Sequence, residues 1–193
     1  LRNEFSIDPN DRVIIMVGEL NDNKNQITII KAMKFLLEKN QNYRLILVGE
    51  GPNRTLYEKI INQENLCDKV TLLGFRSDVD KLMKASDILV SASKREGLPV
   101  NVMEGMSVGL PVVVSSIRGN VDLVENEING YLVEKNEPSL FANKVHLICE
   151  QPVLYSKMQK NNLEKSKNLD SKKIAIKNDE VYTLFSNKKG ADR

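Results

Sequence analysis

The sequence has little of the residue types that build metal and disulfide sites. Its 193 residues include two cysteines, Cys67 and Cys149, a single histidine, His146, and no tryptophan. Two distant cysteines without a CxxC motif provide no disulfide framework, and a lone histidine excludes a Cys/His zinc site. We therefore expect no bound metal, and the cysteine usage fits a protein of the reducing cytoplasm.

Long apolar runs and an excess of one charge are also lacking. No stretch approaches the roughly 18 apolar residues of a membrane-spanning helix, and the start, from Leu1 to Phe5, lacks the pattern of an export signal. The 28 basic and 26 acidic residues leave a formal net charge of +2 with no basic block. Neither nucleic acid nor a membrane surface is therefore predicted as a partner. We expect a cytoplasmic location, with any attachment to the inner face of the cell membrane made by a part of the protein outside this chain.

Short apolar runs rich in Val, Ile and Leu recur along the chain, each too short for a helix, and most of them end at Gly or Ser. They predict buried parallel strands over residues 13–17, 45–48, 70–73, 88–90 and 112–114, with a shorter one at 131–134. Amphipathic segments between them predict helices over 26–39, 55–65, 79–85, 100–108 and 121–126. Parallel neighbours need crossover helices, so the alternation predicts an α/β fold, a Rossmann-like doubly wound sheet of about six strands covered by helices on both faces.

From Pro138 onward the pattern predicts helices only, over 139–150, 153–167 and 171–185, with Ser139 and Ser171 as N-caps. We expect one domain over 13–185. Residues 1–12 are interpreted as the remnant of an interdomain linker, and residues 186–193 as a frayed tail.

In an open α/β sheet, ligands bind beyond the carboxyl ends of the strands, so the strand-to-helix loops are the candidate site. In the first loop, Gly18 permits close approach of the backbone and Lys24 stands near a helix start. Gly49-Glu50-Gly51-Pro52 is a weak signal, because ordinary tight turns use the same residues. Asp78-x-Asp80 is explained better by helix capping from Ser77 or Asp78 than by metal binding.

The loop that follows the fourth strand carries the most information. Pro99 suits the first turn of a helix, which leaves the amides of Val100 and Asn101 as free donors for a phosphate. Glu96 lies just before this helix and Glu104 lies eight residues further on. Because a carboxylate repels a phosphate, we expect both glutamates to accept hydrogen bonds from vicinal hydroxyls of a ribose or hexose.

At these residues the chain resembles the donor-binding, C-terminal half of retaining GT-B glycosyltransferases, specifically glycosyltransferase family 4 (group 1). The resemblance rests on the Glu-x7-Glu pair of Glu96 and Glu104, preceded by VSAS and followed by GMSVGLPVV. It extends over nearly the whole chain through short motifs, which are VGELNDNKN at 17–25, LVGEGP at 47–52, LGFRSD at 73–78, ASDI at 85–88 and NGYLV at 129–133.

The resemblance implies a role for each part of the site. It assigns Glu104 to the ribose hydroxyls, Glu96 to the donor hexose and Lys24 to the diphosphate, with Glu96 and Lys24 as the catalytic pair. Phe75 and Arg76 are implied to lie against the base. The other donor-binding positions are Gly18, Leu98, Val100 and Asn101.

Two departures from the family pattern affect the diphosphate. Glu19 stands where many members carry Arg, so one of the usual phosphate cations is either absent or replaced by Arg95. Pro99 stands where many members carry Gly, which removes one possible amide donor.

By resemblance, the reaction is transfer of a hexosyl unit from a nucleoside diphosphate sugar, expected to be UDP-linked, to a sugar hydroxyl in cell-surface or capsular polysaccharide synthesis. No cofactor is implied beyond the donor substrate. The acceptor is expected on an N-terminal domain that this chain lacks, so the chain alone should be inactive. Two alternatives remain open: a nucleotide-sugar epimerase of the same architecture, and a non-catalytic nucleotide-sugar-binding module.

Overall fold

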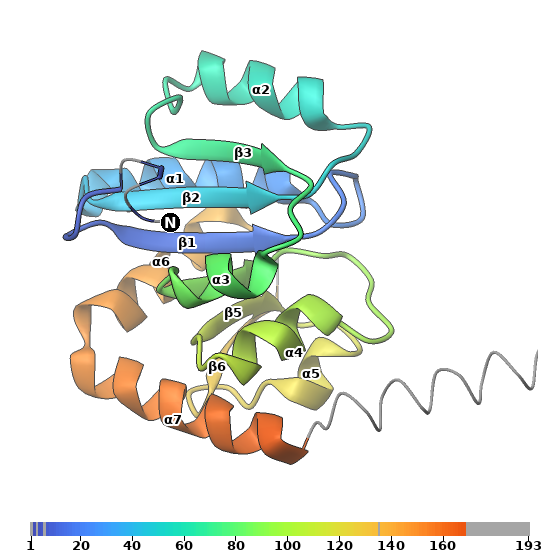
Figure 1. Ribbon diagram of the computed structural model, residues 1–193, viewed down its shortest axis with the longest axis vertical. Helices are drawn as coiled ribbons and strands as arrows, with labels where there is room; N and C mark the ends of the chain where they lie inside the picture. The colour runs from blue at the N-terminus through green and yellow to red at the C-terminus, as the bar shows by residue number, and fades with distance from the viewer. Residues whose placement is uncertain (1, 3, 6, 135, 169–193) are drawn as a thin grey trace, which may run out of the picture.

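The structure is a computed structural model that describes residues 2, 4–5, 7–134 and 136–168. Its centre is one six-stranded parallel sheet with strand order β3-β2-β1-β4-β5-β6, shown in Figure 1. The strands are β1 (Arg12–Val17), β2 (Tyr43–Val48), β3 (Val70–Gly74), β4 (Ile88–Ser91), β5 (Val112–Ser115) and β6 (Gly130–Val133).

Helices connect these strands and close the chain. They are α1 (Gln26–Lys39), α2 (Arg54–Gln63), α3 (Val79–Lys84), α4 (Val100–Ser107), α5 (Asn120–Leu123), α6 (Pro138–Glu150) and α7 (Pro152–Asn168). The predicted doubly wound α/β fold is confirmed. The helix expected over 171–185 and the expected tail at 186–193 lie outside the described residues.

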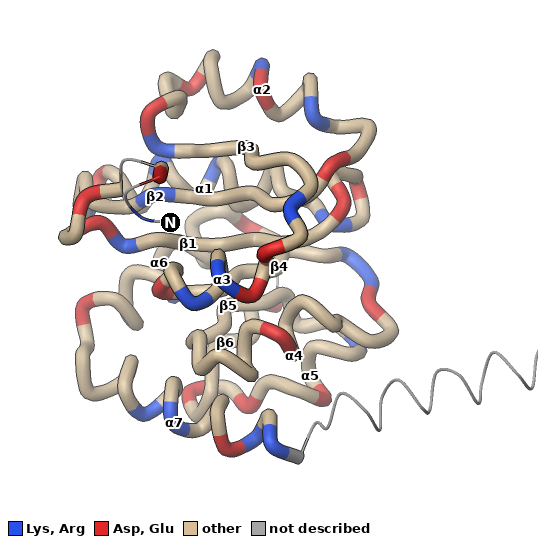
Figure 2. The backbone as a smooth tube through the Cα atoms, viewed as in Figure 1, with Lys and Arg blue, Asp and Glu red and all other residues tan. Residues whose placement is uncertain are grey.

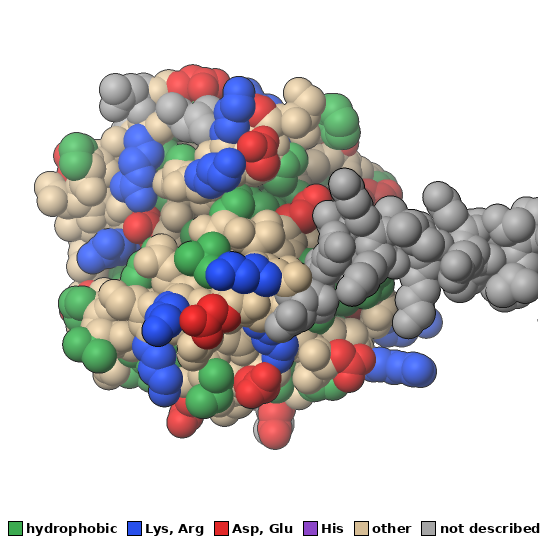
Figure 3. Space-filling view, turned by 60° about the horizontal axis from the view of Figure 1, so that its bottom comes forward, with side chains coloured by type: hydrophobic (Ala, Val, Ile, Leu, Met, Phe, Trp, Pro, Cys, Tyr) green, Lys and Arg blue, Asp and Glu red, His purple; other side chains and the backbone are tan. Residues whose placement is uncertain are grey.

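The strands are apolar on both sides because the sheet is covered on both faces. Alternate residues of β1 show this directly: Ile14 and Met16 belong to the core cluster with α1 and α6, whereas Val13 and Ile15 belong to the cluster with α3 and α4. All four side chains are buried. The outer surface is mixed in charge, and Figure 3 shows basic and acidic side chains next to one another on the face in view.

One expected helix cap is wrong, and another is confirmed in its position only. Helix α6 begins at Pro138 with Glu137 as the N-cap, not at Ser139, because proline has a helical φ preset by its ring and is favoured at the first position of a helix. Asp78 is the N-cap of α3, but its side chain makes no capping hydrogen bond. That carboxylate binds Arg76 instead.

Helix α7 is held to the sheet by a buried pair of asparagines. The Asn162 amide nitrogen donates to the carbonyl oxygens of Leu110 at 2.7 Å and Asn129 at 2.8 Å. The Asn129 amide nitrogen in turn donates to the Asn162 side-chain oxygen at 2.9 Å. Because buried amides need partners, this network fixes α7 against the segments before β5 and β6. No helix in the described part of the chain combines the length and apolarity needed to cross a membrane.

The described residues before β1 pack on the domain. The Arg2 guanidinium donates to the carbonyl oxygens of Ala85 and Asp11, both at 3.0 Å, and to the Asp87 carboxylate at 2.7 Å. Phe5 and Ile7 lie against the core cluster on the α3 side. The segment interpreted as a linker remnant is thus anchored at Arg2, and Arg12 belongs to β1 itself.

Candidate functional site

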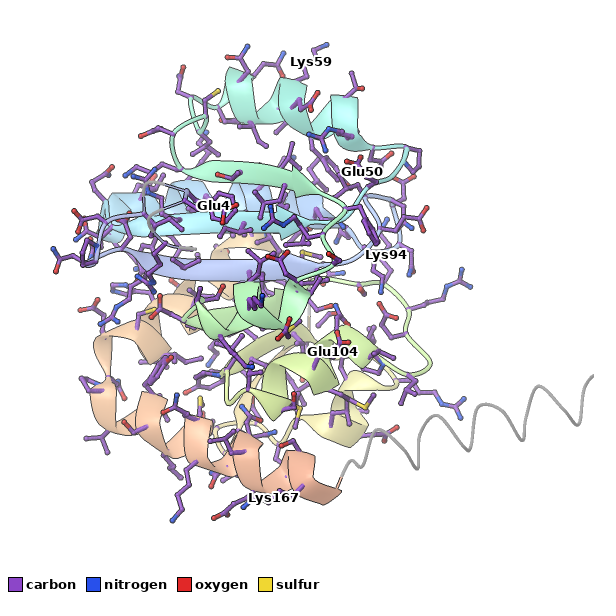
Figure 4. All side chains as sticks on the ribbon, viewed as in Figure 1. Glu4, Glu50, Lys59, Lys94, Glu104 and Lys167 are labelled. Carbon is purple, nitrogen blue, oxygen red and sulfur yellow. The ribbon has the colours of Figure 1, made fainter. Side chains whose placement is uncertain are left out.

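The loops at the carboxyl ends of β1 and β4 are tied together. The Lys94 amide donates to the Asn23 carbonyl at 2.8 Å, and the Asn23 side-chain amide donates to the Arg95 carbonyl at 3.0 Å. In Figure 4, Glu50, Lys94 and Glu104 lie at this same end of the sheet. The carboxyl ends of neighbouring parallel strands lie at the same end of the sheet, so loops that are far apart in the sequence meet there.

Lys24 and Glu96 form an ion pair at this edge. The Lys24 Nζ atom lies 2.6 Å from Glu96 Oε1, and the two side chains are 22% and 11% exposed. Gly18 leaves the room for this lysine, because a Cβ atom at Gly18 would lie 3.3 Å from Lys24 Cδ and Cε. The resemblance assigns these two residues to different parts of the donor, and the structure brings them into direct contact.

The start of α4 differs from the sequence prediction. Pro99 is the N-cap, with φ −80° and ψ 79°, values typical of an inverse γ-turn rather than of a helical turn. The turn directs the Val100 amide to the Leu98 carbonyl at 3.0 Å. The prediction that the Val100 amide is a free donor is therefore wrong.

Asn101 remains as the free amide at the helix start. Its backbone N–H has no acceptor among the described residues, while its side-chain amide donates to the Val17 carbonyl at 2.7 Å. The side chain thus holds α4 against the end of β1 and leaves the backbone amide available. A helix N-terminus with a free amide favours an anion.

Glu104 lies in the second turn of α4 with no side-chain partner among the described residues. Although part of the residue is exposed, desolvation of its carboxyl group raises the pKa above the ordinary value of 4.5. An unpaired and partly desolvated carboxylate gains from a ligand that donates hydrogen bonds to it. The geometry therefore suits a pair of hydroxyl groups.

A hollow of about 780 Å³ opens beside Glu96 and is lined by Asn23, Lys94, Arg95, Glu96, Gly97, Ile117 and Arg118. The loop from β4 to α4 carries adjacent basic and acidic residues in Figure 2. Leu98 and Val100, at 41% and 48% exposed, follow this loop at the surface. Arg95 and Glu96 both line this hollow.

The loop after β5 is part of the site, and the sequence analysis missed it. Gly119 has φ +91°, and a Cβ atom there would lie 2.9 Å from the carbonyl oxygens of Glu96 and Gly97. The neighbouring Asn120 is buried, and its amide nitrogen donates to the Ser115 carbonyl at 2.9 Å. A glycine in a strand-to-helix loop was the available signal for this contact.

Phe75 and Arg76 follow β3 at the same edge but behave differently. Phe75 is 80% exposed. Arg76 instead makes a two-pronged contact with Asp78, with Nε and Nη2 each 2.8 Å from a carboxylate oxygen. Its guanidinium also lies 5.7 Å from the Phe5 ring centroid. The ion pair raises the pKa of Arg76 and lowers that of Asp78.

The structure thus brings some predicted residues together and leaves others apart. Lys24, Glu96 and Arg95 meet on adjoining loops. Among the described residues, no hydrogen bond or ion pair joins the Glu104 side chain to these three residues. Within the same described part, no group of His, Cys, Asp and Glu side chains could hold a metal ion.

Comparison with known proteins identifies the class. Residues 1–165 match the family described as glycosyl transferases group 1. This match covers most of the chain, and the chain belongs to that family.

Individual relatives agree. The chain is 32% identical over 158 residues to the putative glycosyltransferase EpsD of Bacillus subtilis, covering 82% of this chain and 42% of that protein. It is 36% identical over 148 residues to the UDP-Gal:alpha-D-GlcNAc-diphosphoundecaprenol alpha-1,3-galactosyltransferase of Escherichia coli, covering 75% of this chain and 38% of that protein. This chain therefore spans less than half the length of the curated relatives it matches.

A solved structure shows the same fold. Anabaena Alr3699/HepE in complex with UDP-glucose has a TM-score of 0.82 and 27% identity, covering 96% of this chain and 51% of that chain. The fold and the family agree with the GT-B resemblance inferred from the sequence.

Proposed function

We propose that this chain is the C-terminal, donor-binding domain of a retaining glycosyltransferase of family 4. Its donor is a UDP-linked sugar, and its full-length protein acts in the cytoplasm, at the inner face of the membrane, in cell-surface polysaccharide synthesis. The observation that carries the proposal is the arrangement around α4: the Lys24–Glu96 pair lies before the helix, a free amide lies at its start, and an unpaired carboxylate lies in its second turn.

Each group fits one part of a nucleoside diphosphate sugar. The carboxylate of Glu104 accepts hydrogen bonds from the ribose hydroxyls, and Glu96 accepts from hydroxyls of the hexose. The Asn101 amide and the ammonium group of Lys24 bind the diphosphate. The three parts of the ligand then follow α4 and the loop before it.

Lys24 also supports the chemistry in this proposal. When the glycosidic bond to the diphosphate breaks, negative charge grows on the leaving phosphate oxygen. A lysine held at that place by Glu96 stabilises the charge without reorganising, which is the electrostatic role that dominates many such steps. The leaving phosphate takes the acceptor's proton on the same face of the sugar, so the configuration is retained.

Two comparisons support the choice of nucleotide. The Escherichia coli relative is named for UDP-Gal, and the Anabaena structure holds UDP-glucose. The share of the relatives that this chain spans, 42% and 38%, fits one of the two domains of a GT-B enzyme. The acceptor-binding domain is the part that we place outside this chain.

A thermal-shift panel with UDP, GDP, ADP and their sugars tests the proposal. A ligand that binds only the folded state stabilises it by RT ln(1 + [L]/Kd), about 2.7 kcal/mol at 100 times Kd. We expect UDP and a UDP-sugar to raise the melting temperature of the parent chain, and to raise that of Glu104→Ala clearly less at the same ligand concentration. The absence of a shift with every nucleotide, or equal shifts in parent and variant, would overturn the assignment.

A further inference from the structure

The charged side chains that line the hollow beside Glu96 are mainly positive. Three of its lining residues are cations, Lys94, Arg95 and Arg118, and one is an anion, Glu96. That anion is already neutralised by Lys24 at 2.6 Å. No ion pair joins the three lining cations to an acidic side chain in the described part of the chain.

Arg118 is fixed next to Glu96 by the backbone. Gly119, the next residue, lies so close to the Glu96 and Gly97 carbonyls that a Cβ atom would meet them at 2.9 Å. Consecutive Cα atoms are about 3.8 Å apart, so the Arg118 backbone lies beside the Glu96 loop. The Ser116 amide donates to the Val133 carbonyl at 2.8 Å, and the Asn120 amide to the Ile117 carbonyl at 3.0 Å, which holds this loop on both sides of the arginine.

Arg118 lies on a different loop from the groups that the proposed function places on the diphosphate. The Asn101 amide lies at the start of α4, Asn101 is tied to the end of β1, and Lys24 comes from the loop after β1. Arg118 lies in the loop after β5 and lines the same hollow as Glu96, the residue that the proposed function places on the hexose. A second anion at this place would be repelled by Glu96, and the Arg95 and Arg118 cations that line the same hollow offset that repulsion.

We infer that the transferred sugar carries a carboxylate, as a hexuronic acid does, and that Arg118 together with Arg95 binds this group. The planar guanidinium fork matches a carboxylate with two parallel hydrogen bonds. This inference rests on the proposed function, because it assumes that Glu96 marks the hexose position. It makes Arg118 a specificity-determining residue for the sugar.

Calorimetric titration of the purified 193-residue chain tests the inference with a matched pair of ligands. UDP-glucuronic acid and UDP-glucose differ only in a carboxylate and a hydroxymethyl group at one carbon. We expect the parent chain to bind UDP-glucuronic acid about tenfold more tightly, the effect of one charge-assisted hydrogen bond. UDP-galacturonic acid against UDP-galactose repeats the comparison with the other common hexose configuration.

Substitutions of Arg118 test whether this residue causes the preference for the acidic sugar. Arg118→Gln should remove most of the preference, because affinity for UDP-glucuronic acid falls much more than affinity for UDP or UDP-glucose. Arg118→Lys should restore part of the preference, because lysine returns the charge without the planar guanidinium group. Lys59→Gln is the matched control, since Lys59 is an exposed cation on α2, far from Lys94 and Glu104 in Figure 4. Raising the salt concentration should narrow the preference, because the arginine is exposed.

Three results would overturn the inference. One is equal binding of the acidic and neutral sugars in both configurations. Another is an equal loss of UDP affinity in Arg118→Gln, which would assign the arginine to the diphosphate. The third is a preference that survives both Arg118→Gln and Arg95→Gln. If UDP itself does not bind the parent chain, the proposed function fails first, so the two failures are distinguishable.

Discussion

The ammonium group of Lys24 lies 2.6 Å from the carboxylate of Glu96, although the two residues are 72 positions apart in the sequence. Both side chains are mostly buried, at 22% and 11% exposed. A diphosphate that binds Lys24 must therefore share the lysine with Glu96. In the proposed function, this pair would couple recognition of the phosphate to recognition of the sugar.

Removing either partner should separate these two functions. Lys24→Ala should lower affinity for UDP by about 1.5–3 kcal/mol, the range of hydrogen bonds to charged groups, and leave affinity for uridine almost unchanged. Glu96→Gln should keep or raise UDP affinity, because Lys24 is freed, while affinity for the UDP-sugar falls. Calorimetry with uridine, UDP and UDP-glucose measures all three, with Lys59→Ala as the control. An equal loss of uridine and UDP affinity in Lys24→Ala would place the lysine away from the diphosphate.

Glu104 should show a trade-off between stability and binding. Desolvation raises the pKa of Glu104 in the folded protein above the value near 4.5 of the unfolded chain. The contribution of this group to folding stability is therefore fully present below the unfolded-state pKa, and it is lost as the pH rises through the folded-state pKa. Glu104→Gln should therefore be slightly more stable than the parent at pH 7 without ligand. Chemical denaturation at pH 4 and pH 7 checks the sign: the stability difference between variant and parent should be larger at pH 7.

The same variant should bind nucleotide poorly. Glu104→Gln or Glu104→Ala should lose about 1.5–3 kcal/mol of UDP affinity if charge-assisted bonds to the ribose are removed. The affinity of the parent should also fall as pH drops through the Glu104 pKa, because the protonated carboxyl group is a weaker acceptor. A pH-independent affinity in the parent would contradict the ribose assignment.

The repeating elements of the fold were predictable because their causes are local. Buried parallel strands need continuous apolar runs, and α1 shows its polar positions at helical spacing, so the predicted range of 26–39 equals the observed Gln26–Lys39. Strand ends shifted by one or two residues, as at β2, where pairing with β1 extends the strand back to Tyr43. Pairing with a neighbouring strand determines where a strand begins and ends, and the local sequence pattern does not contain that information.

The candidate site depends on contacts between loops that are far apart in the sequence, and only some of these contacts could be predicted. The resemblance placed Lys24 and Glu96 in one site, yet their direct contact follows from the pairing of β1 with β4. The Val100 amide was assigned wrongly because Pro99 forms a γ-turn, a choice that its sequence neighbours do not determine. The close approach of Gly119 to Glu96 needs the β4–β5 pairing and could not be derived from either segment alone.

Gly119 should be sensitive to the smallest substitution. Gly119→Ala puts a methyl group 2.9 Å from two carbonyl oxygens at φ +91°, so we expect a loss of about 1–3 kcal/mol in the free energy of unfolding. The shifted Glu96 loop should also weaken binding of the UDP-sugar. Gly97→Ala is the stability control, because nothing lies within 4 Å of the added Cβ atom. Denaturant titration compares the two, and equal stabilities would show that the loops do not pack as described.

Phe75 and Arg76 should act in different ways on the base. Phe75→Ala should cost about 1–3 kcal/mol of UDP affinity if the ring stacks on uracil, with little change in unfolding because the side chain is 80% exposed. Arg76→Ala should weaken UDP binding indirectly, since it releases the loop from Asp78 and Phe5. Glu4→Gln, which removes the longer 3.5 Å contact to Arg76, should have a smaller effect. Calorimetry with UDP and inorganic pyrophosphate separates the base from the phosphates, and equal losses for both ligands in Phe75→Ala would rule out stacking.

The chain should bind its donor without transferring the sugar. It spans 42% and 38% of the length of two curated relatives, and in the GT-B arrangement that we propose the acceptor is held by the other domain. Holding two reactants in register is worth on the order of 7–11 kcal/mol of the barrier, so donor binding alone should leave the rate near background. Release of UDP from UDP-sugars, with and without candidate acceptors, measures turnover by the 193-residue chain beside a longer protein that includes the acceptor-binding domain. Donor affinities should be similar in the two proteins, because the donor contacts that we propose lie in this chain. Comparable UDP release by the short chain would refute the division of labour. Conversion of the donor to an isomeric sugar nucleotide without UDP release would instead favour an epimerase, which needs no acceptor.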